Sequence, residues 1–401
     1  MPLLALWRSD PDTVSKFTIE QVVSFAGNGK LRDDSECSHE LREYIAQIPS
    51  IKLAEYIDQC LSSSFQNSGY ALQDLVNELG RRLDYTVENG RYAGRTNAVG
   101  NDGLWHSPET TALVVEVKTT DAYRVSIDTI ANYRNELLRS GKIDENSSIL
   151  IVIGRQDTGE LEAQVRCSRH AWDVRLVSAE ALTKIVFLKE NADEDETGRK
   201  IRGVLVPVEY TKIDALVDVV FTAAADVEPT VLEDDAEGEK EKNEAENLKS
   251  RREERSFEFT DAKALQEKRD QIIQTIAARE KKPLIKRTRA MYRSSDRSIR
   301  VACTISKRYD TKVPYWYAYH PSWHEFLLGG ENGYFVLGCM DRSAFYSIPV
   351  AKIAPLLETL NTTERNDKKY WHIHLIEGPT GNLELVIPGS DNVDLNPHEM
   401  H

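Results

Sequence analysis

Three side chains able to do acid–base and metal chemistry occur in the stretch "NDGLWHSPETTALVVEVKTT", namely Asp102, Glu116 and Lys118. Alternate residues of a β-strand project to the same face, so Glu116 and Lys118 share one side of a strand while the neighbouring valines face the core. A turn at Ser107 and Pro108 would form a hairpin and bring Asp102 alongside Glu116. The spacing therefore predicts two carboxylates and an amine at one end of a sheet.

Two carboxylates beside a lysine suit Mg²⁺, which prefers oxygen ligands and usually binds one or two carboxylates together with water and substrate phosphate. Such a metal polarises a phosphoryl oxygen and lowers the pKa of a bound water, which is the chemistry of phosphodiester hydrolysis. Lys118 would position that water or stabilise the charge that develops on the phosphate. The alternative is a surface ion pair, because a glutamate two residues before a lysine is a common pattern.

Helix and strand patterns alternate over residues 66–190. An amphipathic helix and a strand lead to "NDGLW" and "TALVVEVKTT", which are followed by the helix "SIDTIANYRNELLRSG", the buried strand "SSILIVIG" and the strand–helix unit "WDVRLVSAEALTKIVFL". This alternation predicts an α/β fold in which helices flank a mixed sheet. The apolar stripe of the first helix comprises Ala71, Leu72, Leu75, Val76, Leu79 and Leu83.

The order helix, strand, "NDG" and "VVEVKTT" resembles the PD-(D/E)xK restriction-endonuclease-like nuclease superfamily, and within it bacterial restriction-type and defence nucleases. The resemblance covers residues 66–190. It implies a restriction-endonuclease-like mixed sheet flanked by helices, DNA as the substrate and Mg²⁺ or Mn²⁺ as the cofactor. It also implies that Asp102 and Glu116 are the metal ligands and that Lys118 is the catalytic lysine.

Two positions depart from the family pattern. Asn101 stands where the family has proline, and Gln73 stands on the first helix where the family often has an acid. Gln73 could bind the metal through its amide oxygen, and Glu78 is a second possible ligand on that helix. If neither contacts the metal, two side chains hold it and a one-metal mechanism is favoured.

Further residues of the same region are candidates for nucleic-acid contact. Tyr133 would lie over the site and contact phosphate or a base, and a core tyrosine is the alternative. The stretch "QVRCSRHAWDVRL" concentrates guanidinium groups, which suit either bidentate phosphate binding or a structural ion-pair network. Its polar candidates are Gln164, Arg166, Arg169, His170 and Arg175.

Residues 300–401 predict an α+β module of several strands interrupted by one helix, "VAKIAPLLETL". Its aromatic residues could stack on bases or form the core, so DNA binding, sensing, oligomerisation and partner docking are alternative functions. The stretch from Arg279 to Arg300 has nine basic and two acidic residues and would bind phosphate in a salt-dependent way. His372 and His374 share a strand face, and we interpret them as polar residues rather than zinc ligands. The aromatic candidates are Tyr309, Tyr315, Trp316, Tyr317, Tyr319 and Trp323.

The 401-residue chain is predicted to contain four segments. These are a helical N-terminal segment (1–65), the nuclease domain (66–220), an acidic linker with a helix and a basic stretch (221–299), and the aromatic-rich C-terminal module (300–401). In the first segment Ser38 would cap a helix. Asp226 to Arg255 carries twelve acidic and six basic residues, which predicts a disordered linker or a solvated helix.

The composition excludes several classes of protein. A membrane-spanning helix needs about 18 or more consecutive apolar residues, and the sequence has no such run. The N-terminus lacks the pattern of a signal peptide, and five scattered cysteines without a CxxC pair favour a reducing cytoplasm. The formal net charge of −14 is unlike that of a protein that only coats nucleic acid.

The site pattern together with the family resemblance implies a Mg²⁺-dependent DNA endonuclease of bacterial defence, either restriction or anti-phage. We expect it not to associate with membranes, and we expect its C-terminal module to bind DNA or sense a ligand. Cleavage of both strands by one active site per chain favours a homodimer. One alternative is a catalytically inactive nucleic-acid-binding or scaffold protein that retains the nuclease fold. The other is an effector nuclease that is active only with a partner protein of a defence system or with a ligand.

Overall fold

Two compact units, Met1–Ala224 and Ala225–His401, make up the chain. The residues that the structure describes form helices and three β-sheets, which is the mixed α/β composition predicted from the sequence. The acidic stretch from Asp226 to Arg255 lies outside the described residues. The computed structural model describes residues 3–63, 65–92, 100–119, 126–154, 159–192, 195–206, 262–365, 368–378 and 381–401.

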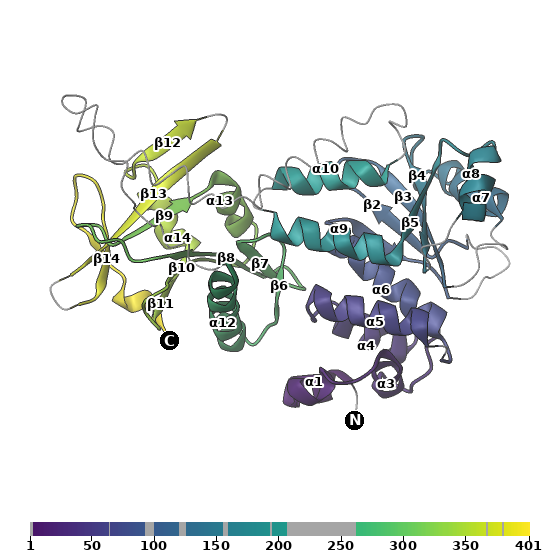
Figure 1. Ribbon diagram of the computed structural model, residues 1–401, viewed down its shortest axis with the longest axis horizontal. Helices are drawn as coiled ribbons and strands as arrows, with labels where there is room; N and C mark the ends of the chain where they lie inside the picture. The colour runs from purple at the N-terminus through teal and green to yellow at the C-terminus, as the bar shows by residue number, and fades with distance from the viewer. Residues whose placement is uncertain are drawn as a thin grey trace, which may run out of the picture. The chain divides into compact units, whose positions relative to one another are not determined.

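A five-stranded mixed sheet forms the centre of the first unit (Figure 1), with its strands in the order of the chain. The first three strands are antiparallel, and the last two run parallel to the third. The strands are β1 (Thr86–Asn89), β2 (Gly103–His106), β3 (Ala112–Lys118), β4 (Ser148–Ile153) and β5 (Val174–Ser178).

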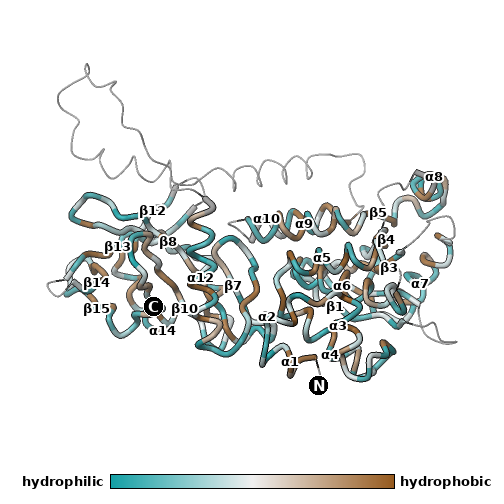
Figure 2. The backbone as a smooth tube through the Cα atoms, turned by 60° about the horizontal axis from the view of Figure 1, so that its bottom comes forward, coloured by the Kyte–Doolittle hydropathy of each residue, from teal (hydrophilic) through white to brown (hydrophobic). Residues whose placement is uncertain are grey.

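Helices cover both faces of this sheet, and alternate residues of β3 show the division. Leu113 and Val115 join the core formed with the N-terminal helices, α6, α9 and α10, whereas Ala112 and Val114 join the core formed with α7 and α8. Helices α9 and α10 carry both apolar and polar segments (Figure 2), as expected for helices with one face on a core. The helices are α1 (Leu3–Ser9), α2 (Pro11–Val14), α3 (Ile19–Phe25), α4 (Glu36–Ile45), α5 (Ser50–Ser62), α6 (Ser68–Arg82), α7 (Ile127–Arg139), α8 (Gly159–Cys167), α9 (Ala179–Asn191) and α10 (Asp195–Leu205).

The start of α4 differs from the prediction. Ser35, not Ser38, caps this helix, because the Ser35 hydroxyl accepts the backbone N–H of Ser38 at 3.1 Å. Ser38 itself is fully buried inside the first turn. The cap lies three residues earlier than predicted because both serines precede acidic residues, and the local pattern does not distinguish them.

The second unit contains a six-stranded mixed sheet and a five-stranded antiparallel sheet. Helix α12 (Ala262–Glu280) packs on one side of the larger sheet, and α13 (Pro321–Leu328), α14 (Val350–Ile353) and the smaller sheet share the core on its other side. The larger sheet has the order β16 (Glu399–Met400), β11 (Phe345–Pro349), β10 (Asn332–Cys339), β8 (Ile299–Ser306), β7 (Met291–Ser294) and β6 (Leu284–Lys286). The smaller sheet comprises β12 (Thr362–Arg365), β13 (Lys368–Glu377), β14 (Leu383–Leu385) and β15 (Val393–Asp394), with β9 (Tyr315–Tyr319) paired to β13. The described residues of this unit also form the short 3₁₀ helices η5 (Ala354–Leu356) and η6 (Asn396–His398).

Two expectations for the second unit are corrected. The prediction of a single helix among its strands is wrong, because α13 precedes α14 in the segment that reads as aromatic strand. Tyr315, Tyr317 and Tyr319 are buried in the core between the two sheets, so these rings pack against protein and cannot stack on bases. None of the helices within the described ranges is long and apolar enough to cross a membrane.

Candidate metal and phosphate site

The hairpin between β2 and β3 brings the three candidate residues together, as the sequence predicts. Ser107 N–H bonds the carbonyl of Thr111 across the turn, and the ladder pairs Gly103 with Val115. Asp102 continues this ladder by donating its N–H to the Val115 carbonyl at 2.9 Å. Asp102 therefore lies opposite Glu116 at the open end of the hairpin.

Direct hydrogen bonds connect the site residues to each other and to the strand. The Lys118 ammonium donates to Glu116 Oε1 at 2.5 Å, so the two side chains share one face of β3. Asp102 Oδ2 accepts the backbone N–H of Val117 at 2.7 Å. This bond holds the Asp102 carboxylate against β3, beside the Glu116–Lys118 pair.

The charges of the site affect one another strongly. Burial and the neighbouring Glu116 carboxylate raise the pKa of Asp102 to about 7, against the lowering effect of the Val117 N–H and Lys118. Burial also raises the pKa of Glu116, and the positive charge of Lys118 offsets part of this increase. For Lys118, burial opposes the charged form, but the two carboxylates outweigh it and raise its pKa. A cation placed between the carboxylates would relieve their mutual repulsion.

The donor set fits a hard divalent cation. Glu116 is only 6% exposed, and its Oε2 atom has no hydrogen-bond partner within the described part of the chain. A buried carboxylate oxygen without a partner is costly, and coordination to a metal would satisfy it. Over the same residues no group of three or more His, Cys, Asp or Glu side chains gathers. Asp102 and Glu116 are therefore the two side chains that would hold Mg²⁺, with water or phosphate oxygens completing its coordination.

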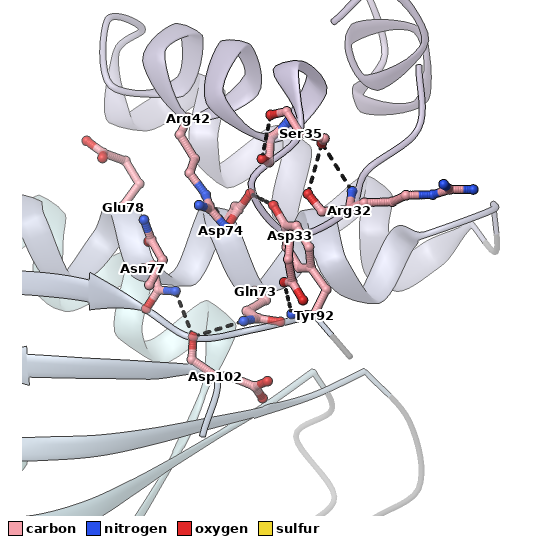
Figure 3. Close-up of polar contacts among 12 residues, drawn as sticks. Arg32, Asp33, Ser35, Arg42, Gln73, Asp74, Asn77, Glu78, Tyr92 and Asp102 are labelled. Atoms are coloured by element: carbon pink, nitrogen blue, oxygen red, sulfur yellow. Dashed lines mark hydrogen bonds and ion pairs between the residues drawn. The ribbon is translucent and has the colours of Figure 1, made fainter. Parts of the chain in front are cut away.

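Helix α6 supplies Gln73 and Glu78, which the sequence marked as possible further ligands. The Gln73 amide nitrogen donates to the backbone carbonyl of Asp102 at 3.0 Å (Figure 3). Glu78 points away from Asp102 in the same view and pairs with Arg82 at 2.8 Å. Gln73 thus contacts the site through its nitrogen, and Glu78 belongs to a buried ion pair.

Helix α6 carries a second acid, Asp74, which the sequence patterns did not single out. It is fully buried, accepts Arg42 Nε at 2.9 Å and accepts the hydroxyl of Tyr92. The backbone N–H of Tyr92 also donates to Asp33 at 2.8 Å. These bonds fasten the chain that follows β1 to α4 and α6, and they engage the Asp74 carboxylate fully.

Tyr133 on α7 lies beside the site. Its hydroxyl packs against Gly100, two residues before Asp102, where an added Cβ would be 2.7 Å from it. Burial and the negative charge of Glu116 raise the pKa of Tyr133, and the positive charge of Lys118 lowers it in part. It is half-buried against the core under α7, so the two alternatives proposed for it are compatible.

The basic candidates of the following segment are dispersed. Arg169 and His170 both contact Asp128, in the first turn of α7, at 3.2 and 3.1 Å. Arg175 pairs in register with Leu150, whose side chain faces the core with α9 and α10, and donates to the Val206 carbonyl at 3.0 Å. It therefore lies on the sheet face opposite Glu116. Arg166 bonds the Glu162 carbonyl within α8 at 3.4 Å, and Gln164 is exposed on the same helix.

The paired histidines of the second unit take part in protein contacts. His372 accepts the indole N–H of Trp316 at 3.2 Å and lies 2.7 Å from the Thr363 hydroxyl. Burial lowers the pKa of His374 and so favours its neutral form. Their environment agrees with the interpretation of both as strand residues.

Asn77 belongs to the site although no sequence pattern predicted it: it is fully buried, and its side-chain nitrogen donates to the Asp102 carbonyl at 2.9 Å. Its oxygen accepts the indole N–H of Trp105 at 2.8 Å. The available signal was weak, because Asn77 lies one helical turn after Gln73 on the side of the helix outside the apolar stripe, where a polar residue is expected.

Comparisons with known proteins add no assignment. No protein-family model matches the chain, and no curated protein matches it significantly.

Proposed function

We propose that this protein is a Mg²⁺-dependent DNA endonuclease with a restriction-endonuclease-like first unit. The observation that carries the proposal is the buried Glu116 carboxylate at the end of a hairpin: one of its oxygens accepts a hydrogen bond from Lys118, the other has no partner within the described residues, and Asp102 lies on the opposite strand. The sheet supports it further, because an antiparallel β1–β2–β3 followed by parallel β4 and β5, with helices on both faces, is a mixed sheet of the kind expected.

The residues of the site have distinct roles in this proposal. A bound divalent ion would polarise a phosphoryl oxygen and lower the pKa of a water. Asp102 and Glu116 would hold that ion through their carboxylate oxygens. The Lys118 side chain is 37% exposed, so its ammonium can reach a phosphate from solvent and stabilise the charge that develops there. Tyr133 would border the bound phosphate from α7.

The decisive experiment measures plasmid cleavage with Mg²⁺, with EDTA, and by variants of one lysine. Lys118→Ala should lower the rate by about 100- to 1,000-fold, the usual loss when a group that stabilises transition-state charge is removed. Lys142→Ala is the matched control, because Lys142 is an exposed lysine in the same unit. Equal cleavage by the wild type and Lys118→Ala, or cleavage that persists in EDTA, would exclude this active site.

Other outcomes separate the alternatives. DNA binding without cleavage would favour a catalytically inactive binding or scaffold protein. Cleavage that appears only when a partner protein or a nucleotide is added would favour an effector nuclease regulated through the second unit. The proposed setting is bacterial defence, restriction or anti-phage, and the proposed active form is a homodimer, because one site per chain cuts one strand.

A further inference from the structure

The backbone carbonyl of Asp102 accepts three hydrogen bonds. The donors are Gln73 Nε2 at 3.0 Å, Asn77 Nδ2 at 2.9 Å and the backbone N–H of Gly90 at 2.9 Å. A carbonyl oxygen has two lone pairs, and one donor usually satisfies it. Two buried side-chain amides therefore donate hydrogen bonds to the Asp102 carbonyl, although the backbone N–H of Gly90 already satisfies it.

The two side chains, which we call the amide pair (Gln73 and Asn77), are both buried, and a second hydrogen bond fixes the orientation of Asn77. They lie four residues apart on α6, hence on one helix face, and are 3% and 0% exposed. Trp105 Nε1 donates to Asn77 Oδ1, so the Asn77 nitrogen must face Asp102. Gly103 leaves the necessary space, since a Cβ there would lie 2.2 Å from Asn77 Oδ1.

The amide pair approaches Asp102 from the side opposite its carboxylate, as Figure 3 shows. Fixing the peptide plane of a residue restricts the direction of its Cα–Cβ bond, and therefore of its side chain. The remaining freedom of the carboxylate is restricted by the Val117 N–H on Oδ2. The geometry points to Gln73 and Asn77 as positioning residues that aim the Asp102 carboxylate at the ion shared with Glu116.

This inference rests on the proposed function and gives Gln73 a role different from metal ligation. The Asp102 carbonyl can only accept hydrogen bonds, so the Gln73 atom facing it must be the amide nitrogen. A glutamate at position 73 could not donate and would repel that carbonyl. The acid that the nuclease pattern leads one to expect would thus be harmful in this chain.

Gln73→Glu tests the inference in the full-length protein, with Mn²⁺ affinity measured by calorimetry. We expect the variant to bind Mn²⁺ about 10- to 100-fold more weakly, the usual loss when a residue that orients a metal ligand is removed. If Gln73 were itself a ligand, the added carboxylate would tighten binding. Gln271→Glu is the control, because it makes the same charge change at an exposed position of α12 in the second unit.

Thermal unfolding separates positioning from general stability, since a merely structural role would change the melting temperature without changing the Mn²⁺ affinity of the folded protein. If Gln73→Glu does not fold, the nearly isosteric Gln73→Met removes the donor without adding charge and should still weaken binding severalfold. If either folded variant binds Mn²⁺ as tightly as the wild type or more tightly, the positioning role of Gln73 is wrong, but the proposed function still stands. Absence of Mn²⁺ binding by the wild type overturns the proposed function, and this inference with it.

Discussion

The proton on Asp102 determines when the site can accept a cation. Burial and the Glu116 carboxylate raise the pKa of Asp102 to about 7, so below that pH a divalent ion must displace a proton. We expect Mn²⁺ affinity to fall about tenfold per pH unit below 7 and to level off above it. Calorimetric titrations at several pH values measure this dependence.

Asp102→Asn is the control for this pH dependence, because it removes the titrating group. The folded state holds the Asp102 proton more tightly than the unfolded chain, so the wild type without metal loses stability as pH rises from about 4 to about 7. The variant should therefore be the more stable protein above pH 7 and should show a flatter pH profile of metal binding. A wild-type Mn²⁺ affinity that does not vary across this range would contradict the assignment of Asp102.

Helix α6 and strand β2 approach closely at Gly80. A Cβ at this position would lie 2.6 Å from Cε2 of the buried Trp105, whose indole holds Asn77. Gly80→Ala should therefore destabilise the first unit by about 1–3 kcal/mol through overpacking, although alanine is the better helix former. Chemical denaturation measures the change in the free energy of unfolding.

Gly203 on α10 provides the matched comparison, because a Cβ there meets nothing within 4 Å. Gly203→Ala should show the helix-propensity gain alone, about 0.5–1 kcal/mol of added stability. Opposite signs for the two substitutions would establish the close packing of α6 on Trp105. A stabilising Gly80→Ala would show that the helix and strand can separate there at little cost.

Local patterns predict the elements of the site, and long-range packing decides how they are connected. The period of two in β3 and the turn at Ser107 are encoded within a few residues, so the hairpin and the shared face of Glu116 and Lys118 follow from sequence. The bonds from Gln73 and Asn77 to Asp102 join residues 29 and 25 positions apart. They depend on where α6 packs against the sheet, which no local pattern specifies.

Burial explains the remaining differences between prediction and structure. The alternating aromatic residues of β9 could either stack on bases or belong to a hydrophobic core. Strand β9 pairs with β13, and this smaller sheet shares a core with the larger sheet, so the aromatic residues are buried there. Arg175 lies in β5, and the sheet face to which its side chain points depends on the pairing of β5 with β4, in which Arg175 is the partner of Leu150. In both cases the chemistry of the residue was recognised, but its environment depended on a distant partner strand.

At the scale of the whole molecule, each compact unit has hydrophobic cores of its own. Separate cores predict two thermal transitions in calorimetry rather than one. Leu150 and Phe335 are each fully buried, one in each unit. Leu150→Ala should reduce the free energy of unfolding of the first unit by about 2–5 kcal/mol and lower the temperature of one transition only. Phe335→Ala should reduce that of the second unit by about 3–5 kcal/mol and lower the temperature of the other transition only.

Metal binding assigns the two transitions to their units. A ligand that binds only the folded state stabilises it by about 2.7 kcal/mol at 100 times its dissociation constant. Asp102 and Glu116 both belong to the first unit. Mn²⁺ should therefore raise the temperature of the transition that is sensitive to Leu150→Ala. It should not change the temperature of the transition that is sensitive to Phe335→Ala. A single transition that both substitutions lower and that Mn²⁺ raises as a whole would mean that the cores unfold together, and that the second unit could influence the metal site directly.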